Sequence, residues 1–183
     1  MAMDFTLKLQ RIEEVIAQYK GIELENPQRK QLEERISGLV KELKEELDAA
    51  PVSERPLCSR VVEQVKIMDD DFHAKHQEFT LKAIQKFKDE KLPSFESAVA
   101  EYKNTYFKDP KRKDLETSIP LLGEKLNQEL IGITGPNMNV MSKELLESYS
   151  AQSKLSTLQT DFLTKFLQNQ SEDMGGSQFH WSA

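Results

Sequence analysis

The fold is decided by residues 61–83, which read VVEQVKIMDDDFHAKHQEFTLKA. Along this stretch the apolar side chains recur at intervals of three, four or seven residues, at Val61, Val65, Met68, Phe72, Phe79 and Ala83. In a helix of 3.6 residues per turn these intervals place the apolar side chains on one face, which must be buried against another helix. The stretch therefore predicts a long amphipathic helix that packs in a bundle.

The same spacing recurs in two other long stretches of the chain. One contains Leu32, Ile36, Leu39, Leu43 and Leu47, and the other contains Leu155, Leu158, Phe162 and Phe166. The chain has only seven glycines and seven prolines, and most of them fall near residues 21–26, 50–56, 92–94, 107–110 and 132–140. These are too few turn residues for an all-β fold. We therefore expect an all-α, elongated helical bundle of about six helices with coiled-coil-like packing and no sheet.

Prolines mark the expected ends and irregularities of these helices. Asn26-Pro27 reads as a helix N-cap followed by proline at the first helical position, and Asp109-Pro110 repeats that signal. Pro93 is expected to end or kink the long third helix. Pro120 and Gly123 predict a kink or a short break in the fifth helix. We see no internal repeat in the sequence.

The length and composition bound the domain organisation. At 183 residues, with 38% hydrophobic and 31% charged residues, the chain suits one domain of amphipathic helices with solvated outer faces. We expect a helical bundle over residues 1–169, with a subdivision near residues 92–110. Residues 170–183, QSEDMGGSQFHWSA, are polar and contain glycine, so we expect them to form a flexible tail.

Charge and cysteine content argue against several classes of protein. The net charge of −6 disfavours nucleic acid and anionic membranes as main partners. The single cysteine, Cys58, rules out an internal disulfide framework. No apolar run approaches the roughly 20 residues of a membrane span, and the first ten residues lack the apolar core of a signal peptide. We expect a cytoplasmic protein, or one exported without a cleaved signal peptide.

The best candidate for a metal site is the acidic and histidine-containing stretch of the third helix. Asp69, His73 and His76 fall within an arc of about 60° on a helix, where carboxylate and imidazole groups can ligate a divalent metal. A metal-binding helical bundle normally needs a matching motif on another helix, and we find none. The alternative is that His76 lies at the edge of the core and that residues 69–71 form a solvated acidic turn.

A basic stretch is the second candidate site, and it is interleaved with Tyr102, Tyr106 and Phe107. Its basic residues are Lys103, Lys108, Lys111, Arg112 and Lys113. Positive charge beside exposed aromatic rings is suited to phosphate groups or to an acidic partner protein. The alternative is a charged loop between helices, whose tyrosines face the core.

The third candidate lies near the C-terminus, where Phe179 and Trp181, the only tryptophan, stand close together. Two aromatic side chains in a polar segment can anchor a short docking motif in a partner's groove. The alternatives are an incidental end of the chain and a tail that folds back onto the bundle.

No catalytic motif or cofactor-binding loop is present, so we expect no cofactor. The sequence favours a non-enzymatic protein-protein interaction module, such as a scaffold, an adaptor or a helical subunit of an assembly. A bacterial effector or its chaperone also fits. We expect partners that are helical proteins, including a second copy of the chain. The alternatives are a metal-binding bundle built on Asp69, His73 and His76, and a membrane-surface-binding helical dimer that uses the 103–113 stretch.

Overall fold

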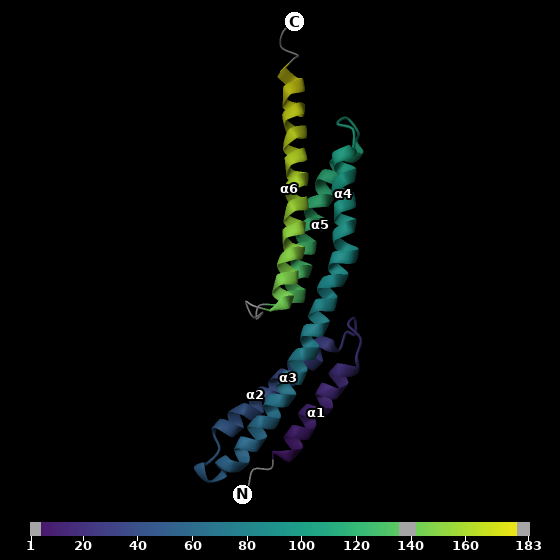
Figure 1. Ribbon diagram of the computed structural model, residues 1–183. Coiled ribbons are helices and arrows are strands. Elements are labelled where there is room, and N and C mark those ends of the chain that lie inside the picture. The colour runs from purple at the N-terminus through teal and green to yellow at the C-terminus, as the bar shows by residue number, and fades with distance from the viewer. Residues whose placement is uncertain (1–4, 136–141, 179–183) are drawn as a thin grey trace. The chain divides into compact units, whose positions relative to one another are not determined.

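The structure is a computed structural model that describes residues 5–135 and 142–178 (Figure 1). Over these residues it contains helices and no strand, which confirms the all-α prediction. A short 3-10 turn, Val52–Glu54, and a π-helical turn, Phe87–Lys91, accompany the α-helices. The α-helices are α1 (Thr6–Gly21), α2 (Arg29–Asp48), α3 (Arg55–Lys86), α4 (Leu92–Asn104), α5 (Lys111–Thr134) and α6 (Lys143–Gln178).

The break predicted near residues 92–94 is absent. The π-helical turn Phe87–Lys91 joins α3 directly to α4, and the backbone N–H of Leu92 bonds the carbonyl of Phe87, five residues earlier. Pro93 lies in the first turn of α4, after this wider turn. The widened turn relieves the clash that a proline ring normally makes with the carbonyl four residues before it. The described residues therefore form five continuous helices rather than about six.

The short break expected in the fifth helix is absent, and one other predicted helix boundary is wrong. Helix α5 continues through Pro120 and Gly123 without a break. Pro120 is exposed, so water can bond the carbonyl that loses its helical donor. Helix α6 continues to Gln178, although the sequence predicted a flexible tail from residue 170. Hydropathy missed this extension because the side chains that hold it, Asn169 and Asp173, are polar and bond partners on other helices.

The chain divides into two compact units, residues 1–79 (unit 1) and residues 80–183 (unit 2). We expected one bundle to residue 169 with a subdivision near residues 92–110, so the boundary lies earlier than predicted. It falls inside α3, between the last core residue of unit 1, Phe79, and the first core residue of unit 2, Ile84. Each unit consequently has three helical segments and its own hydrophobic core.

The core of unit 1 is built from the predicted apolar stripes. Its side chains come from α1, α2 and α3, and Cys58 lies among them as a buried thiol. Tyr19 is fully buried and packs its ring on the rings of Phe72 and Phe79, with centroids 5.2 and 5.3 Å away. The remaining core residues are Phe5, Ile12, Val15, Ile16, Ile36, Val40, Leu43, Leu47, Val61 and Val65.

The core of unit 2 is formed by the end of α3, the π-helical turn, α4, α5 and α6. Helices α4, α5 and α6 run side by side (Figure 1). Tyr102 is again fully buried, with its ring centroid 4.9 Å from that of Phe162. The other core residues are Ile84, Phe87, Leu92, Phe95, Val99, Ile119, Leu126, Leu130, Ala151, Leu155 and Leu158.

The two units contain an internal repeat that the sequence analysis missed. At an offset of 83 residues, as from Tyr19 to Tyr102, residues 9–48 align with residues 92–131 without a gap. At the same offset, residues 60–79 and 143–162 of the third helices share one identical residue, Phe79 at the position of Phe162. Fifteen of the forty aligned residues are identical, at Leu9, Glu13, Ala17, Tyr19, Lys20, Pro27, Arg29, Lys30, Leu32, Glu33, Ile36, Leu39, Leu43, Glu46 and Leu47. The first two helical segments of each unit are therefore a sequence repeat, and a third helix completes each unit.

Candidate functional site

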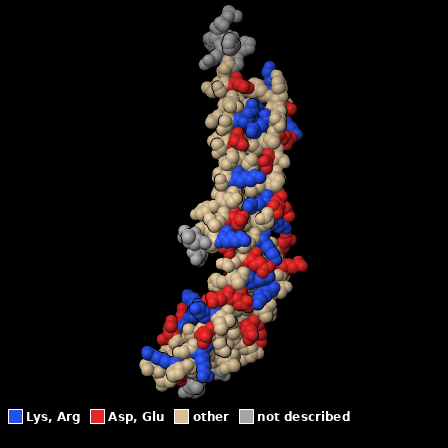
Figure 2. All heavy atoms as spheres, in the orientation of Figure 1, with Lys and Arg blue, Asp and Glu red and all other residues tan. Residues whose placement is uncertain are grey.

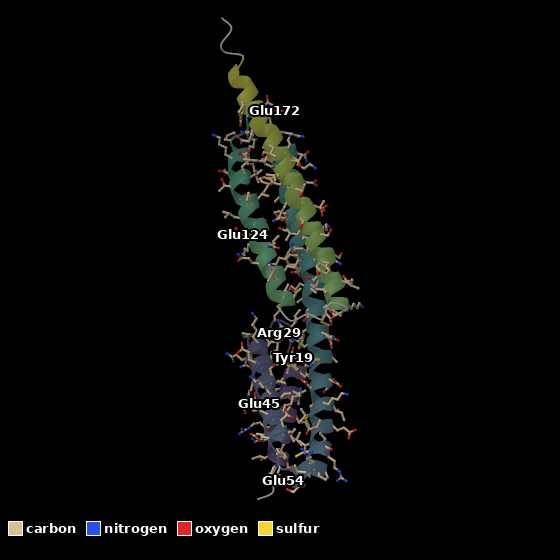
Figure 3. All side chains as sticks on the ribbon, turned by 90° about the vertical axis from the view of Figure 1, so that its left-hand side faces the viewer. Tyr19, Arg29, Glu45, Glu54, Glu124 and Glu172 are labelled. Carbon is tan, nitrogen blue, oxygen red and sulfur yellow. The ribbon has the colours of Figure 1, made fainter. Side chains whose placement is uncertain are left out.

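A polar cluster closes one end of the helices in unit 1, and we call it cluster 1. It consists of Tyr19 on α1, Arg29 and Glu33 on α2, and His76 on α3 (Figure 3 labels Tyr19 and Arg29). The Tyr19 hydroxyl donates to Glu33 Oε1 over 2.9 Å, and Arg29 Nη1 bonds the same oxygen at 3.1 Å. His76 Nδ1 lies 3.2 Å from the Tyr19 hydroxyl and 3.3 Å from Glu33 Oε1.

The environment of cluster 1 fixes the protonation of its acidic groups. Burial, and then the hydrogen bond to Glu33, raise the pKa of Tyr19 well above its usual range. Burial alone would raise the pKa of Glu33, but hydrogen bonds from His76 and Tyr19 and the charge of Arg29 lower it. At neutral pH Tyr19 is therefore neutral and Glu33 is ionised, which is the arrangement that ties three helices together.

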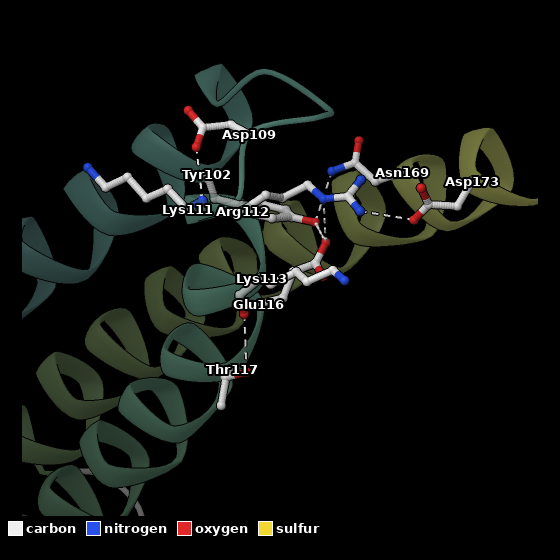
Figure 4. A network of polar contacts seen from close by, with 9 residues as sticks. All are labelled: Tyr102, Asp109, Lys111, Arg112, Lys113, Glu116, Thr117, Asn169 and Asp173. Carbon is white, nitrogen blue, oxygen red and sulfur yellow. Dashed lines mark hydrogen bonds and ion pairs between the residues drawn. The ribbon is translucent and has the colours of Figure 1, made fainter. Parts of the chain in front are cut away.

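Unit 2 contains a related cluster, which we call cluster 2 (Figure 4). Its Tyr102, Arg112 and Glu116 stand at the repeat positions of Tyr19, Arg29 and Glu33, whereas its α6 residues, Asn169 and Asp173, do not correspond to His76. The Tyr102 hydroxyl donates to Glu116 Oε1 over 2.8 Å and accepts a bond from Asn169 Nδ2 at 3.0 Å. Arg112 Nε lies 3.4 Å from Glu116 Oε1, and Arg112 Nη2 donates to Asp173 Oδ2 at 2.9 Å. Cluster 2 thus joins α4, α5 and the C-terminal part of α6.

Cluster 2 is built around a buried arginine. The Arg112 side chain is only 6% exposed, and its guanidinium lies 4.6 Å from the centroid of the Phe107 ring. Burial, and then the hydrogen bond to Glu116, raise the pKa of Tyr102 to about 12. The charge of Arg112 is balanced within the unit by Glu116 and Asp173. The cluster therefore joins the helices of unit 2 through paired charges.

Matching turns place the arginine of each cluster. The side chain of Asn26 accepts the backbone N–H of Gln28 at 2.9 Å, and Asp109 accepts that of Lys111 at 2.9 Å. The backbone carbonyls of Asn26 and Asp109 then accept the N–H groups of Arg29 and Arg112. Helix α2 begins at Arg29 rather than directly at Pro27, so the predicted N-cap acts in an Asx-turn that leads into the helix.

The structure does not bring Asp69, His73 and His76 together as a metal site. His73 Nδ1 lies 2.6 Å from the backbone oxygen of Asp69, and Asp69 Oδ2 accepts a bond from Lys44 Nζ at 3.0 Å. His76 faces cluster 1 instead. Across residues 5–135 and 142–178 no three His, Cys, Asp or Glu side chains converge in a metal-binding arrangement. His73 also lies 3.3 Å from Asp69 Oδ1 on its own helix, so these two side chains do meet. His76 does not join them, because Tyr19 and Glu33 on neighbouring helices are its partners.

The basic stretch does not form one surface either. Arg112 points into unit 2, and Lys111 pairs with Glu101, whose hydrogen bond raises the pKa of Lys111. Lys103, Lys108 and Lys113 are exposed. Acidic and basic side chains alternate over the face that Figure 2 shows. As the alternative reading expected, Tyr102 faces the core, whereas Tyr106 is exposed. Phe179 and Trp181 lie outside the described residues.

An exposed, uncharged stripe on α6 was missed by the sequence analysis, and we call it the α6 stripe. Its residues follow a heptad spacing of three and four, at Leu146, Tyr149, Ser153, Ser156, Thr160, Leu163 and Leu167. The leucines and Tyr149 are each more than half exposed, and the three hydroxyl residues are exposed as well. The core residues Ala151, Leu155 and Phe162 occupy the opposite side of the helix. Helix α6 therefore has a buried apolar face and, opposite it, an exposed uncharged face.

A groove lies between α1 and α3 in unit 1. It measures about 840 Å³, with Ile16, Ala17, Ile67 and Met68 among its lining residues. The matching positions in unit 2, Val99 and Ala100, line a smaller groove of about 260 Å³ together with Leu158 on α6. An ion pair joins α1 to α3 at the groove of unit 1, since Lys20 Nζ lies 2.8 Å from Asp71 Oδ2.

Comparison of the chain with known protein families, with curated proteins and with solved structures finds no match. No helix in the described part of the chain combines the length and the apolar character needed to cross a membrane.

Proposed function

We propose that this protein is a non-enzymatic interaction module that binds helical partner proteins through the α6 stripe. The observation that carries the proposal is the exposure of Leu146, Tyr149, Leu163 and Leu167 on one face of a well-formed helix. Each leucine would contribute roughly 1.5–3 kcal/mol if a partner buried it fully. A solvent-facing helix surface normally carries charged residues at such positions.

The positions that flank the stripe support the same function. In the heptad of the α6 stripe, the neighbouring positions on one side are Ser150, Thr157 and Thr164, and those on the other side include Gln152 and Gln159. All of these side chains are uncharged. A partner helix can therefore approach along the whole stripe without burying an unpaired charge, which would oppose binding.

The polar clusters support a binding role rather than catalysis. In clusters 1 and 2 the ionised groups are paired with one another and hold helices together. The proposed role is that of a scaffold, an adaptor or a helical subunit of an assembly, with the cytoplasm as its compartment. The packing of α6 on α4 and α5 within unit 2 would then hold the α6 stripe in place.

Affinity capture with three forms of the full chain tests this function. The forms are the wild type, a Leu163→Glu/Leu167→Glu variant, and a Leu121→Glu control. Leu121 is also exposed, but it lies on α5 and is not part of the α6 stripe. We expect quantitative mass spectrometry to show proteins that the wild type and the control enrich and that the stripe variant loses. If the stripe variant captures the same proteins as the wild type, the proposed function is wrong.

A further inference from the structure

The α6 stripe reads almost the same in both directions. Two large apolar residues, Leu146 and Tyr149, stand at its N-terminal end, and Leu163 and Leu167 stand at its C-terminal end. Between them lie three small hydroxyl residues, Ser153, Ser156 and Thr160. The spacing is symmetric about Ser156 to within one residue, because Tyr149 and Leu163 both lie seven residues from it, and Leu146 and Leu167 lie ten and eleven residues from it. A pattern with this symmetry is complementary to itself when it is reversed.

We propose that the α6 stripe pairs with the α6 stripe of a second copy of this chain in antiparallel orientation. The two-fold axis would pass beside Ser156, and two symmetric sets of contacts would form around it. Leu146 of one copy would pack against Leu167 of the other, and Tyr149 against Leu163. This proposal rests on the proposed function, since it names the helical partner that the stripe binds.

The side chains at the centre allow the two helices to approach closely. Ser153, Ser156 and Thr160 are small, so a facing helix can approach there while the larger residues interlock at both ends. Their hydroxyl groups can bond to backbone carbonyls of their own helix, as Thr160 does to Ser156 at 2.9 Å. Their polar atoms are consequently not left without partners when water is excluded.

Two observations favour the antiparallel over the parallel orientation. In a parallel, in-register pair, Tyr149 would face Tyr149 at one level, whereas the reversed pair places each Tyr149 opposite the smaller Leu163. The macrodipoles of two helices also oppose each other favourably when the helices are antiparallel. The heptad positions beside the stripe named above are uncharged, so charge pairing favours neither orientation. Side-chain size and the helix dipoles therefore determine which orientation is preferred.

The length of the stripe sets the expected strength of the pairing. From Leu146 to Leu167 the seam extends for about 32 Å, at 1.5 Å per residue. A single helix pair of this length falls short of the roughly 800 Å² per partner that tight complexes bury, so we expect a dissociation constant on the order of 10 µM. The dimer would form and dissociate with protein concentration.

The experiment is sedimentation equilibrium of the purified full chain between about 5 and 500 µM, a range that brackets the expected dissociation constant. We expect the wild type to pass from monomer to dimer. Leu146→Glu and Leu167→Lys, each alone, should weaken dimerisation by at least about 100-fold, because each dimer would bury two unpaired charges. The Leu121→Glu control should dimerise like the wild type.

A mixture of the two charged variants tests the orientation. In the antiparallel pair the introduced glutamate faces the introduced lysine of the other copy, and the second contact remains Leu167 against Leu146. The mixture should therefore recover dimerisation to within about 10-fold of the wild type. In a parallel pair neither introduced charge gains a partner and the mixture stays monomeric. Circular dichroism checks that each variant keeps the helical content of the wild type.

Three results would overturn the proposed antiparallel self-pairing. They are a wild type that stays monomeric throughout the concentration range, a mixture that fails to recover, and a control that is weakened as much as the stripe variants. A monomeric wild type that still captures proteins through the stripe would reject this inference and retain the proposed function. Loss of both would reject the two together.

Discussion

Units 1 and 2 contain related helix pairs, with fifteen of forty aligned residues identical, but they pack their third helix differently. In unit 2 all three helices pack closely against one another, with α6 against both α4 and α5. In unit 1 the close pair is α1 with α2, and the α3 backbone stays farther away. The large rings of Phe72 and Phe79 fill the distance, and the groove of about 840 Å³ remains beside them.

The residues at matching positions explain this difference. Val40 and Met68 of unit 1 correspond to Gly123 and Ala151 of unit 2. A Cβ atom at Gly123 would lie 2.9 Å from Gln159 Nε2 and 3.2 Å from Phe95 Cζ, closer than side chains normally pack. The glycine thus allows α6 to approach, whereas the larger residues of unit 1 hold α3 away. The small size of Gly123 and Ala151 therefore accounts for the closer packing of α6 in unit 2.

The first prediction tests whether the phenylalanine ring found at matching positions of the two units is equally important for stability in both. Phe79→Ala and Phe162→Ala should each cost about 3–5 kcal/mol, because both rings are buried against the cluster tyrosine. Equilibrium denaturation with urea measures the loss. A cost near zero for either variant would show that the ring at that position is not a core residue, and that the repeats are not equivalent there.

The second prediction separates the two arginines. Arg112→Ala should destabilise unit 2 by about 3 kcal/mol, since it leaves the carboxylates of Glu116 and Asp173 without their buried partner. Arg29→Ala should cost less than about 1 kcal/mol, because its pair with Glu33 is partly exposed and His76 and Tyr19 still contact Glu33. Native-state hydrogen exchange resolves the two units. Equal costs would contradict the different burial of the arginines.

The third prediction transfers the residue of unit 1 into unit 2. Gly123→Val should cost about 1–3 kcal/mol through overpacking against Phe95 and Gln159. Gly132→Val on the same helix is the matched control, since no atom lies within 4 Å of its added Cβ. Thermal unfolding compares the two variants. A Gly123→Val protein as stable as the control would show that α6 can move away without loss.

The smallest expected effect is a pH dependence in cluster 1. The pKa of Glu33 is lowered below its ordinary value of 4.5, so the ionised carboxylate stabilises the fold above pH 4.5. That contribution is lost as the pH falls from 4.5 through the lowered pKa. Glu33→Gln should cost about 1 kcal/mol at pH 7 and make stability depend less on pH below 4.5. Urea titrations at several pH values check this. An unchanged slope would exclude Glu33 as the acid-sensitive group.

The sequence predicted the helices well where apolar spacing alone determines them. The stripes through Phe72, Phe79 and Phe162 are core faces, and the Asx-Pro signals at Asn26 and Asp109 do lead into helices. Pattern analysis failed where a polar group has a distant partner. Asp173, which bonds Arg112 from 61 residues away, is an example, since it makes helical a segment that composition describes as a tail.

The candidate sites were harder to predict, for the same reason. Arg112 belongs to a basic run in the sequence, and only the fold shows that it is buried. The repeat escaped notice because its most informative identities are the polar cluster residues Tyr, Arg and Glu, which an apolar pattern ignores. The α6 stripe is interrupted by Ser153, Ser156 and Thr160, so hydropathy does not mark it. The spacing of its uncharged positions was the available signal.

The buried thiol of unit 1 has a practical consequence. Cys58 is the only cysteine of the chain, and it lies in the core of residues 1–79, so unit 2 carries no thiol at all. A thiol-reactive probe can reach Cys58 only when unit 1 opens. The labelling rate in native buffer therefore reports the opening free energy of one repeat in the presence of the other, with no substitution required. Cys58 is thus a built-in probe for the opening of unit 1.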